Sequence, residues 1–246
     1  MELKILGSSS KGNCYLLDNG KEALMIECGI AFKEVQKAVD FDIKRIKGCI
    51  ISHEHGDHAA HVKQVLKNMI PCYMSQGTRT ALGLDDNPIS YSMIECLPYR
   101  IGSFTVQPFG VEHDAKEPFG FLIAHSDCGT VLFATDTYYL QYTFANLSNI
   151  MIECNYRQSI LDENVAAGKI SAKQRDRTMK SHCSIETCKE ILQNNDLSAV
   201  NNIVLIHMSN DNSHAEEFRA EIQAETLKQV SVAQTGMTIS FNKSPF

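Results

Sequence analysis

Short apolar runs separated by glycine- and serine-containing turns fill the first fifty residues. Runs of this length, bounded by turns and rich in branched side chains, are typical of β-strands. The spacing then becomes helical over 62–69, where apolar residues recur at i, i+3, i+4 and i+7, and Pro71 just beyond ends the helix. The pattern predicts strands at 3–6, 14–17, 23–26, 49–52 and 72–74.

The second half of the chain repeats this organisation. A helix with apolar spacing over 185–192 precedes an apolar run at 203–206, and a Glu-rich amphipathic helix is expected at 214–228. No linker rich in Pro, Gly or Ser divides the chain. We therefore expect one domain over 1–246 with an α/β (α+β) fold, in which two mixed sheets face each other and helices lie outside. Its remaining strands are predicted at 104–106, 119–123, 131–134, 150–152 and 237–241.

Composition and charge narrow the classes of function. The 246 residues are 43% hydrophobic and 21% charged, which is ordinary for a globular protein and excludes disorder and fibrous repeats. The formal net charge is −6, so no overall positive field attracts nucleic acid. Any polyanionic substrate must therefore be attracted by a local site.

The first residues, MELKIL, contain no basic stretch followed by an apolar one. Nowhere do about 18 apolar residues run together. We therefore expect a cytoplasmic protein without a membrane partner. The nine cysteines form no CxxC pair and lie mostly in apolar runs, which favours reduced core residues over disulfides or a thiolate metal site.

The strongest chemical signal is the sequence HEHGDH at 53–58, directly after the apolar run 48–51. Residues two apart on an extended chain project to the same face, so His53 and His55 can converge on one cation. Asp57 and His58 fall where the chain turns into the next helix and can serve a second cation. Imidazole and carboxylate ligands without thiolate favour an open catalytic site for Zn²⁺, Mn²⁺ or Fe²⁺ over a solvated histidine-rich loop.

One hexapeptide cannot supply two coordination spheres, so further ligands are expected from other strand ends. His113, Asp136 and His207 each follow a predicted strand. Any one of them alone is equally well explained as a satisfied residue at the end of a strand. Their joint appearance with the hexapeptide favours a metal centre.

Taken in this order along the whole chain, these residues resemble the metallo-β-lactamase superfamily. The resemblance implies a four-layer αββα fold with a dinuclear metal centre at the open edge between the sheets. The early Asp of the superfamily corresponds here to Glu27, which is expected beside the ligands. The resemblance also implies one ion held by His53, His55 and His113, a second held by Asp57, His58 and His207, and Asp136 bridging both.

Within the superfamily, four segments are similar to the YycJ/WalJ-type branch and to ribonuclease Z. They are LGSSSKGN at 6–13, HDA with EPFGF within 113–121, SHCS at 181–184 and LIHMSN at 205–210. Thr135 stands where Gly is frequent, and ECNY at 153–156 only partly matches the ESNHD-like run of that branch. Asp136 stands where thiolate-type lactamases have Cys. The 71 residues from Asp136 to His207 (207 − 136) are too few for a large inserted domain.

Such a centre suits phosphodiester hydrolysis. Two divalent cations with two carboxylate ligands leave about +2 in the cleft, which attracts a phosphate. A pair of cations also lowers the pKa of bound water from about 15.7 to about 7 and stabilises the oxygens around phosphorus. The resemblance implies that Asp57 orients the attacking hydroxide and takes up its proton. It further implies that His182 contacts the phosphoryl oxygen or protonates the leaving group; the alternative for His182 is a polar residue that merely starts a helix.

The segment 168–180 carries a local charge of +4, because five basic residues face only Asp176. Charge runs of this kind are usually solvated loops. This one leads directly into His182, so we expect it to grip a nucleic-acid backbone beside the metals. The expected substrate-binding residues are Arg175, Arg177 and Lys180.

The sequence thus predicts a dinuclear phosphodiesterase, foremost a nuclease acting on DNA, with two divalent ions (Zn²⁺ or Mn²⁺, with Fe²⁺ as a third option). Nucleic acid or another phosphodiester is the expected partner, and the oligomeric state is open. The first alternative is a hydrolase of a small ester, lactone or cyclic phosphodiester at the same centre. A di-iron redox protein or a degenerate binding module is disfavoured, since there is no room for a flavin domain and no ligand is missing.

Overall fold

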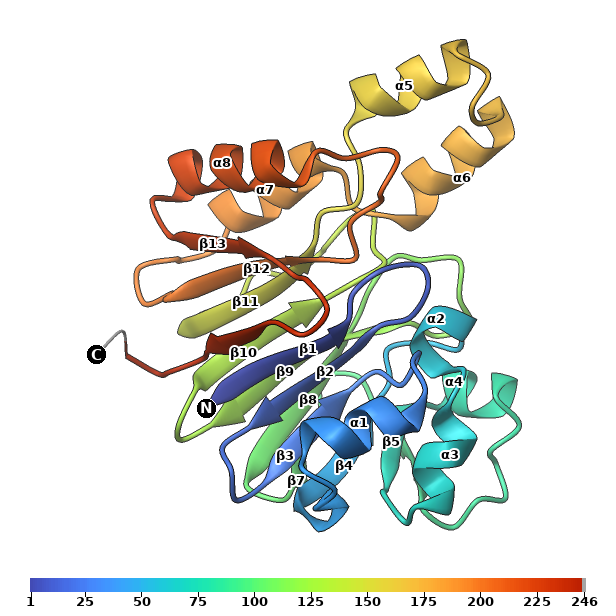
Figure 1. The fold of residues 1–246 in the computed structure, drawn as a ribbon, viewed down its shortest axis with the longest axis vertical. Helices are drawn as coiled ribbons and strands as arrows, with labels where there is room; N and C mark the ends of the chain where they lie inside the picture. Colours follow the sequence, from blue (N-terminus) through green and yellow to red (C-terminus); the bar gives the residue numbers. More distant parts are fainter. Residues whose placement is uncertain (245–246) are drawn as a thin grey trace.

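The computed structural model describes residues 1–244, which form two seven-stranded sheets packed face to face (Figure 1). The first sheet has the order β14-β1-β2-β3-β4-β5-β6 and the second the order β13-β12-β11-β10-β9-β8-β7. The strands of the first sheet are β1 (Glu2–Gly7), β2 (Cys14–Asp18), β3 (Ala23–Ile26), β4 (Ile46–Ile50), β5 (Cys72–Ser75), β6 (Ser90–Met93) and β14 (Thr238–Ser240). Those of the second are β7 (Tyr99–Ile101), β8 (Phe104–Gly110), β9 (Phe119–His125), β10 (Gly129–Ala134), β11 (Leu147–Glu153), β12 (Asn202–Ile206) and β13 (Gln229–Val232).

Both sheets are built in the same way. Three strands pair antiparallel in sequence, β1 to β3 and β8 to β10, and each meander continues into parallel strands. Because these strands are parallel, their carboxyl ends lie at the same edge of the sheet, and the polar loops that follow them gather there. The last strand, β14, returns to pair with β1 and thereby ties the C-terminal part of the chain to the first sheet.

Helices cover the outer face of each sheet, which completes four layers (Figure 1). One core cluster fills the space between the sheets, with the rings of Phe121 and Phe133 stacked 6.4 Å apart. A second cluster joins the first sheet to its helices, and a third joins the second sheet to α7 and α8. The helices are α1 (Phe32–Ala38), η1 (Ile43–Arg45), α2 (Gly56–Ala59), α3 (Val62–Lys67), α4 (Gln76–Ala81), α5 (Gln158–Ala166), α6 (Ala172–Ser181), α7 (Ile185–Gln193) and α8 (Ala215–Thr226).

The predicted two mixed sheets between helices are confirmed. Most predicted strands agree with the structure to within a few residues, but the strand expected at 49–52 is β4, which ends at Ile50. Beyond it the chain leaves the sheet ladder, because the Ser52 amide donates to Glu27 Oε1 at 3.1 Å. The sequence patterns did not predict α1, α4, α5, α6, β6, β7 or β13.

A helical arm formed by α5 and α6 projects from the four layers (Figure 1). Its second helix, α6, covers residues 172–180 of the basic segment 168–180, for which an ordinary solvated loop was the alternative. At its base, Arg157 pairs with Glu217 and Glu221 of α8. Further out, the buried Asn164 donates from Nδ2 to the Asp211 carbonyl at 2.8 Å. These contacts fix the arm against α8 and against the loop that follows β12.

The nine cysteines are free and eight are buried, as expected; Cys96 is exposed. Among residues 1–244, no helix combines the length and the apolar composition needed to cross a bilayer.

Candidate metal centre

Just beyond the ends of three strands, at the same edge of the two sheets, a residue adopts an unusual backbone conformation. Glu27, Asp136 and His207 have φ values of 64°, 48° and 51°, in the left-handed region that residues other than glycine rarely adopt. Glu27 and His207 directly follow β3 and β12, and Asp136 follows β10 after one residue. The left-handed turn redirects each chain just beyond its strand, and such local strain is concentrated at functional sites.

The hexapeptide 53–58 is locked in place by its backbone. The Asp57 carbonyl accepts a hydrogen bond from the Asn13 amide at 2.7 Å, and the His58 carbonyl accepts one from the Cys28 amide at 2.7 Å. Gly29 packs so closely here that a Cβ atom would lie 1.7 Å from the Asp57 oxygen. Only glycine fits at that position, and the start of α2 is held rigidly under the site.

Two groups of side chains converge at this edge. In the first, His55 Nδ1 lies 3.1 Å from His53 Nε2 and 3.2 Å from His113 Nε2. The second group consists of Asp57, His58, Asp136 and His207, and the ligand atoms within each group lie within 4.8 Å of one another.

Asp136 lies between the two groups. Its Oδ2 atom is 3.3 Å from His53 Nε2 and 2.8 Å from His58 Nε2. Ligand atoms arranged tetrahedrally around a zinc ion at about 2.0–2.1 Å are about 3.3 Å apart, so the spacing of these atoms fits bound divalent metal ions. The structure therefore brings together all seven side chains predicted as ligands.

Comparison with known proteins agrees with this geometry. The model of the metallo-β-lactamase superfamily matches residues 9–134, which include the hexapeptide, His113 and the whole of β10. The chain belongs to the metallo-β-lactamase superfamily. The resemblance predicted from the sequence is thus confirmed.

Two curated relatives match nearly the whole chain. Exodeoxyribonuclease WalJ of Streptococcus pneumoniae serotype 2 is 26% identical over 252 residues, covering 96% of this chain and 91% of WalJ. Exodeoxyribonuclease YycJ of Bacillus anthracis is 23% identical over 234 residues, covering 90% of this chain and 88% of YycJ. The solved metallo-β-lactamase fold protein YhfI of Bacillus subtilis shares 16% identity and superposes with a TM-score of 0.73 over 97% of this chain and 98% of that one. The predicted similarity to the YycJ/WalJ-type branch and the predicted fold are confirmed.

The charges in this superfamily centre depend on one another. Burial alone would lower the pKa of His58 and of His207, but Asp136 and the neighbouring carboxylates raise both well above the usual range. Burial would raise the pKa of Asp136, yet His207 and His58 hold it well below its usual range. Without a metal ion, protons on these imidazoles thus balance the buried carboxylates.

A third group of side chains adjoins the centre and contains a residue that the sequence analysis did not assign. The fully buried Glu153, at the end of β11, has Oε1 2.7 Å from His182 Nδ1 and 3.0 Å from His207 Nδ1. Its Oε2 accepts from the amides of Thr137 and Cys183. Glu153 therefore fixes the orientation of both imidazoles. Its place at the end of a buried strand and the partial match of ECNY to the branch pattern were the signals in the sequence.

His182 is the cap residue at the C-terminal end of α6. Burial tends to lower its pKa, but the Glu153 and Asp136 carboxylates outweigh burial and raise it to about 9. Glu27 lies on the other side of the centre, where its Oε2 is 3.5 Å from His58 Nδ1. Both residues contact the ligand side chains directly.

A cavity of about 360 Å³ opens over the centre between the core and the arm. Its lining includes His55, Asp57, Asp136 and His207 from the core, Gln174, Arg177 and Thr178 from α6, and His182, which caps that helix. Arg177 is 3.2 Å from Asp114, next to His113. Arg175 instead pairs with Asp162 and Asp176 of the arm. Of the three predicted substrate-binding residues, the structure places Arg177 in the cavity wall and leaves Arg175 and Lys180 outside its lining.

The charge balance predicts that metal binding releases protons. Since the pKa of His58 and of His207 is raised, both are protonated near neutral pH in the metal-free protein, and a metal ion must displace those protons. We expect the enthalpy of Zn²⁺ binding at pH 7 to depend on the ionisation enthalpy of the buffer, and the affinity to fall as the pH is lowered. Titration calorimetry in two buffers measures the released protons. His207→Ala should reduce their number and the exposed control His214→Ala should not; a buffer-independent enthalpy would contradict the assignment.

Proposed function

We propose that the protein is a metal-dependent nuclease that hydrolyses phosphodiester bonds of DNA. The observation that carries the proposal is the buried Asp136 carboxylate between two groups of metal-ligating side chains. Curated relatives that match nearly the whole chain are named exodeoxyribonucleases, which supports DNA as the substrate. The proposed resident ions are two Zn²⁺ or two Mn²⁺, with Fe²⁺ as a third option.

The proposed ligands divide as the two groups do. His53, His55 and His113 would hold one ion, Asp57, His58 and His207 the other, and Asp136 would contact both. When bound, such a pair of ions activates water as a nucleophile and stabilises the charge that develops on the phosphoryl oxygens.

The protein's own residues orient the reacting groups. The Asp57 side chain is 22% exposed, its Oδ2 is 3.2 Å from His207 Nε2, and it lines the cavity. It is therefore placed to orient the attacking water and to accept its proton. His182 uses Nδ1 to contact Glu153, which leaves Nε2 as the nitrogen available to a substrate in the cavity. Held protonated by this carboxylate, His182 can donate a proton to the departing oxygen.

The arm supplies the positive surface that the chain lacks overall. Arg177 lines the cavity and its side chain is 71% exposed, so it can contact a phosphate of the substrate. Lys180, exposed one turn further along α6, extends this surface. Arg175 is already paired with two carboxylates and contributes less.

The proposed activity is tested by reconstituting the metal-free protein with Mn²⁺ or Zn²⁺. We expect hydrolysis of bis-p-nitrophenyl phosphate and of labelled DNA, and its loss in His113→Ala, while the control His61→Ala remains active. A panel of thioesters and lactones is assayed in parallel. Turnover of carbon esters without turnover of either phosphodiester would refute the proposal.

Glu153→Gln tests the role of Glu153 as a positioning residue. Since Glu153 acts through His182, Glu153→Gln and His182→Ala should each lower kcat by about a hundredfold or more, as for loss of a general acid. The double variant should be little worse than either single one, because neighbours that act together are not additive. Steady-state kinetics with a control at the exposed Glu163→Gln measures this; additive losses would show that the two residues act independently.

Two neighbouring arginines of α6 form a matched pair for testing the arm. Arg177→Gln should raise the KM for DNA by roughly three- to tenfold. It should also reduce the slope of log binding constant against log salt concentration by about the amount expected for one phosphate contact. Arg175→Gln should change both quantities far less, because its charge is neutralised within the arm. Equal effects of the two substitutions on KM and on the salt slope would argue against Arg177 as the contact.

A further inference from the structure

Two neighbouring tyrosines stand out on the loop that follows Asp136. Tyr138 and Tyr139 are 42% and 55% exposed, and neither phenol oxygen has a hydrogen-bond partner among residues 1–244. The other large side chains of this loop pack inward: Leu140 is buried, and the ring of Phe144 lies 4.8 Å from that of Phe109. The two tyrosine rings are thus turned to solvent on a loop that is otherwise anchored.

The backbone of these tyrosines is rigid. Thr137 Oγ1 accepts from the Glu112 amide at 3.1 Å and donates to the Tyr139 carbonyl at 2.5 Å. The Tyr138 amide donates to the Glu112 carbonyl at 3.3 Å, and the Thr137 amide donates to Glu153 Oε2 at 3.2 Å. Rings carried on such a frame lose little conformational freedom when a ligand stacks on them.

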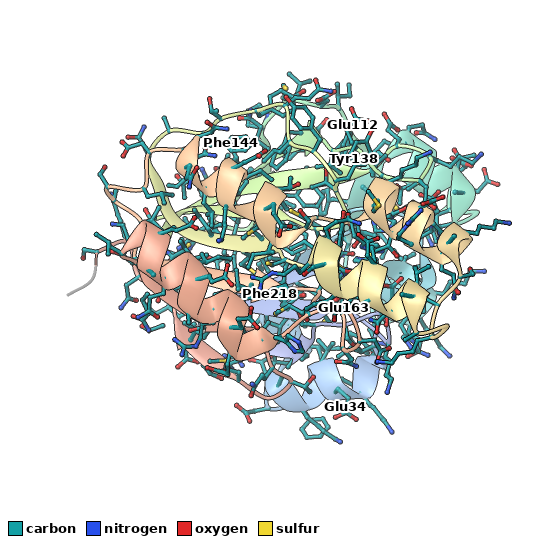
Figure 2. The ribbon with its side chains drawn as sticks, turned by 90° about the horizontal axis from the view of Figure 1, so that it is seen from above. Glu34, Glu112, Tyr138, Phe144, Glu163 and Phe218 are labelled. Carbon is teal, nitrogen blue, oxygen red and sulfur yellow. The ribbon has the colours of Figure 1, made fainter. Side chains whose placement is uncertain are left out.

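The backbone of the tyrosines adjoins two segments that carry candidate metal ligands. Glu112, which holds the Tyr138 backbone, directly precedes His113 in the chain, and Tyr138 directly follows Thr137 and Asp136. Figure 2 shows Tyr138 next to Glu112, on the loops at the edge of the second sheet. The 112–114 segment lies between the tyrosines and the arm. Glu112 at one end contacts the Tyr138 backbone, and Asp114 at the other end pairs with Arg177 of α6.

Charge distinguishes the two sides of this segment. On the tyrosine side, the Glu112 carboxylate accepts a hydrogen bond from Gln141 Nε2 at 2.8 Å, on the same loop as the two tyrosines. On the arm side, α6 presents Arg177, with Lys180 exposed one turn away. A polyanion should therefore place its phosphates towards the arm and an uncharged face towards the tyrosines.

We propose that Tyr138 and Tyr139 form a stacking surface for the bases of a single-stranded nucleic acid entering the metal centre. The proposal rests on the proposed nuclease function and specifies its substrate. Base faces are free to stack on aromatic side chains only in single strands, and such stacking tolerates any base. The unpaired strand then lies across the centre with its bases on Tyr138 and Tyr139 and its phosphates near Arg177.

Binding of a labelled twelve-nucleotide single strand, followed by fluorescence anisotropy, tests this surface directly. The double variant Tyr138→Ala, Tyr139→Ala should bind the strand about tenfold more weakly than the wild type. A strand of equal length without bases should bind the two proteins equally, because it retains only the phosphates. Tyr138→Phe with Tyr139→Phe should restore binding, since the aromatic faces remain.

Tyr91→Ala is the matched control, because Tyr91 is 43% exposed but lies on β6, stacked on Tyr73. Its affinity for the strand should equal that of the wild type. An unchanged affinity in the double alanine variant, or an equal loss for strands with and without bases, overturns the proposal. The former result leaves a protein partner as the occupant of these rings.

Hydrolysis of bis-p-nitrophenyl phosphate by the double alanine variant is measured separately and should equal that of the wild type. If the wild type hydrolysed neither this ester nor labelled DNA, the nuclease function would be refuted, whereas the stacking surface is judged by anisotropy alone.

Discussion

The organisation of this protein depends on one buried carboxylate. Asp136 is 2% exposed, and a charge so deep in a protein is tolerated only with compensating positive charge close by. The compensation comes from strand ends and helix ends that are distant in sequence, and the left-handed residues after β3, β10 and β12 direct the chain to this point. Five imidazoles lie within 4 Å of its oxygens, those of His53, His58, His113, His182 and His207. The neighbouring carboxylates raise the pKa of His58, His182 and His207, which carry the compensating charge, whereas burial lowers the pKa of His53 and His113.

Sequence patterns predicted the elements that bury a regular apolar face. The β3 strand agrees residue for residue, and α7 agrees closely because Ile185, Cys188 and Ile191 face the core. The arm escaped prediction because α6 is mostly polar and buries only Ser181. The capping box formed by Ser171 and Gln174 was the local signal for this helix. The strand β7, with three residues at the sheet edge, is too short to show a period.

Prediction of the site followed a similar division. The spacing within 53–58 and the position of the strand-end residues indicated the candidate metal ligands that the structure brings together, and the family resemblance ordered them. Glu153 could not be assigned in this way, since its importance lies in its contacts with His182 and His207, which are 29 and 54 positions away. Arg175 and Arg177 look alike in sequence, and only the direction of each side chain on α6 distinguishes a neutralised charge from one in the cavity wall.

The attachment of the α5–α6 arm has an evolutionary consequence. Contacts of Arg157 hold it at its base and those of Asn164 further out, and Arg177 and Ser181 connect it to the 113–114 segment. The remaining outer surface of both helices touches nothing on which the imidazole cluster depends. Residues on that surface can therefore change during evolution and alter which substrates the arm contacts, without disturbing the residues of the centre. Gly29 cannot change in this way, because any side chain there would collide with the Asp57 backbone.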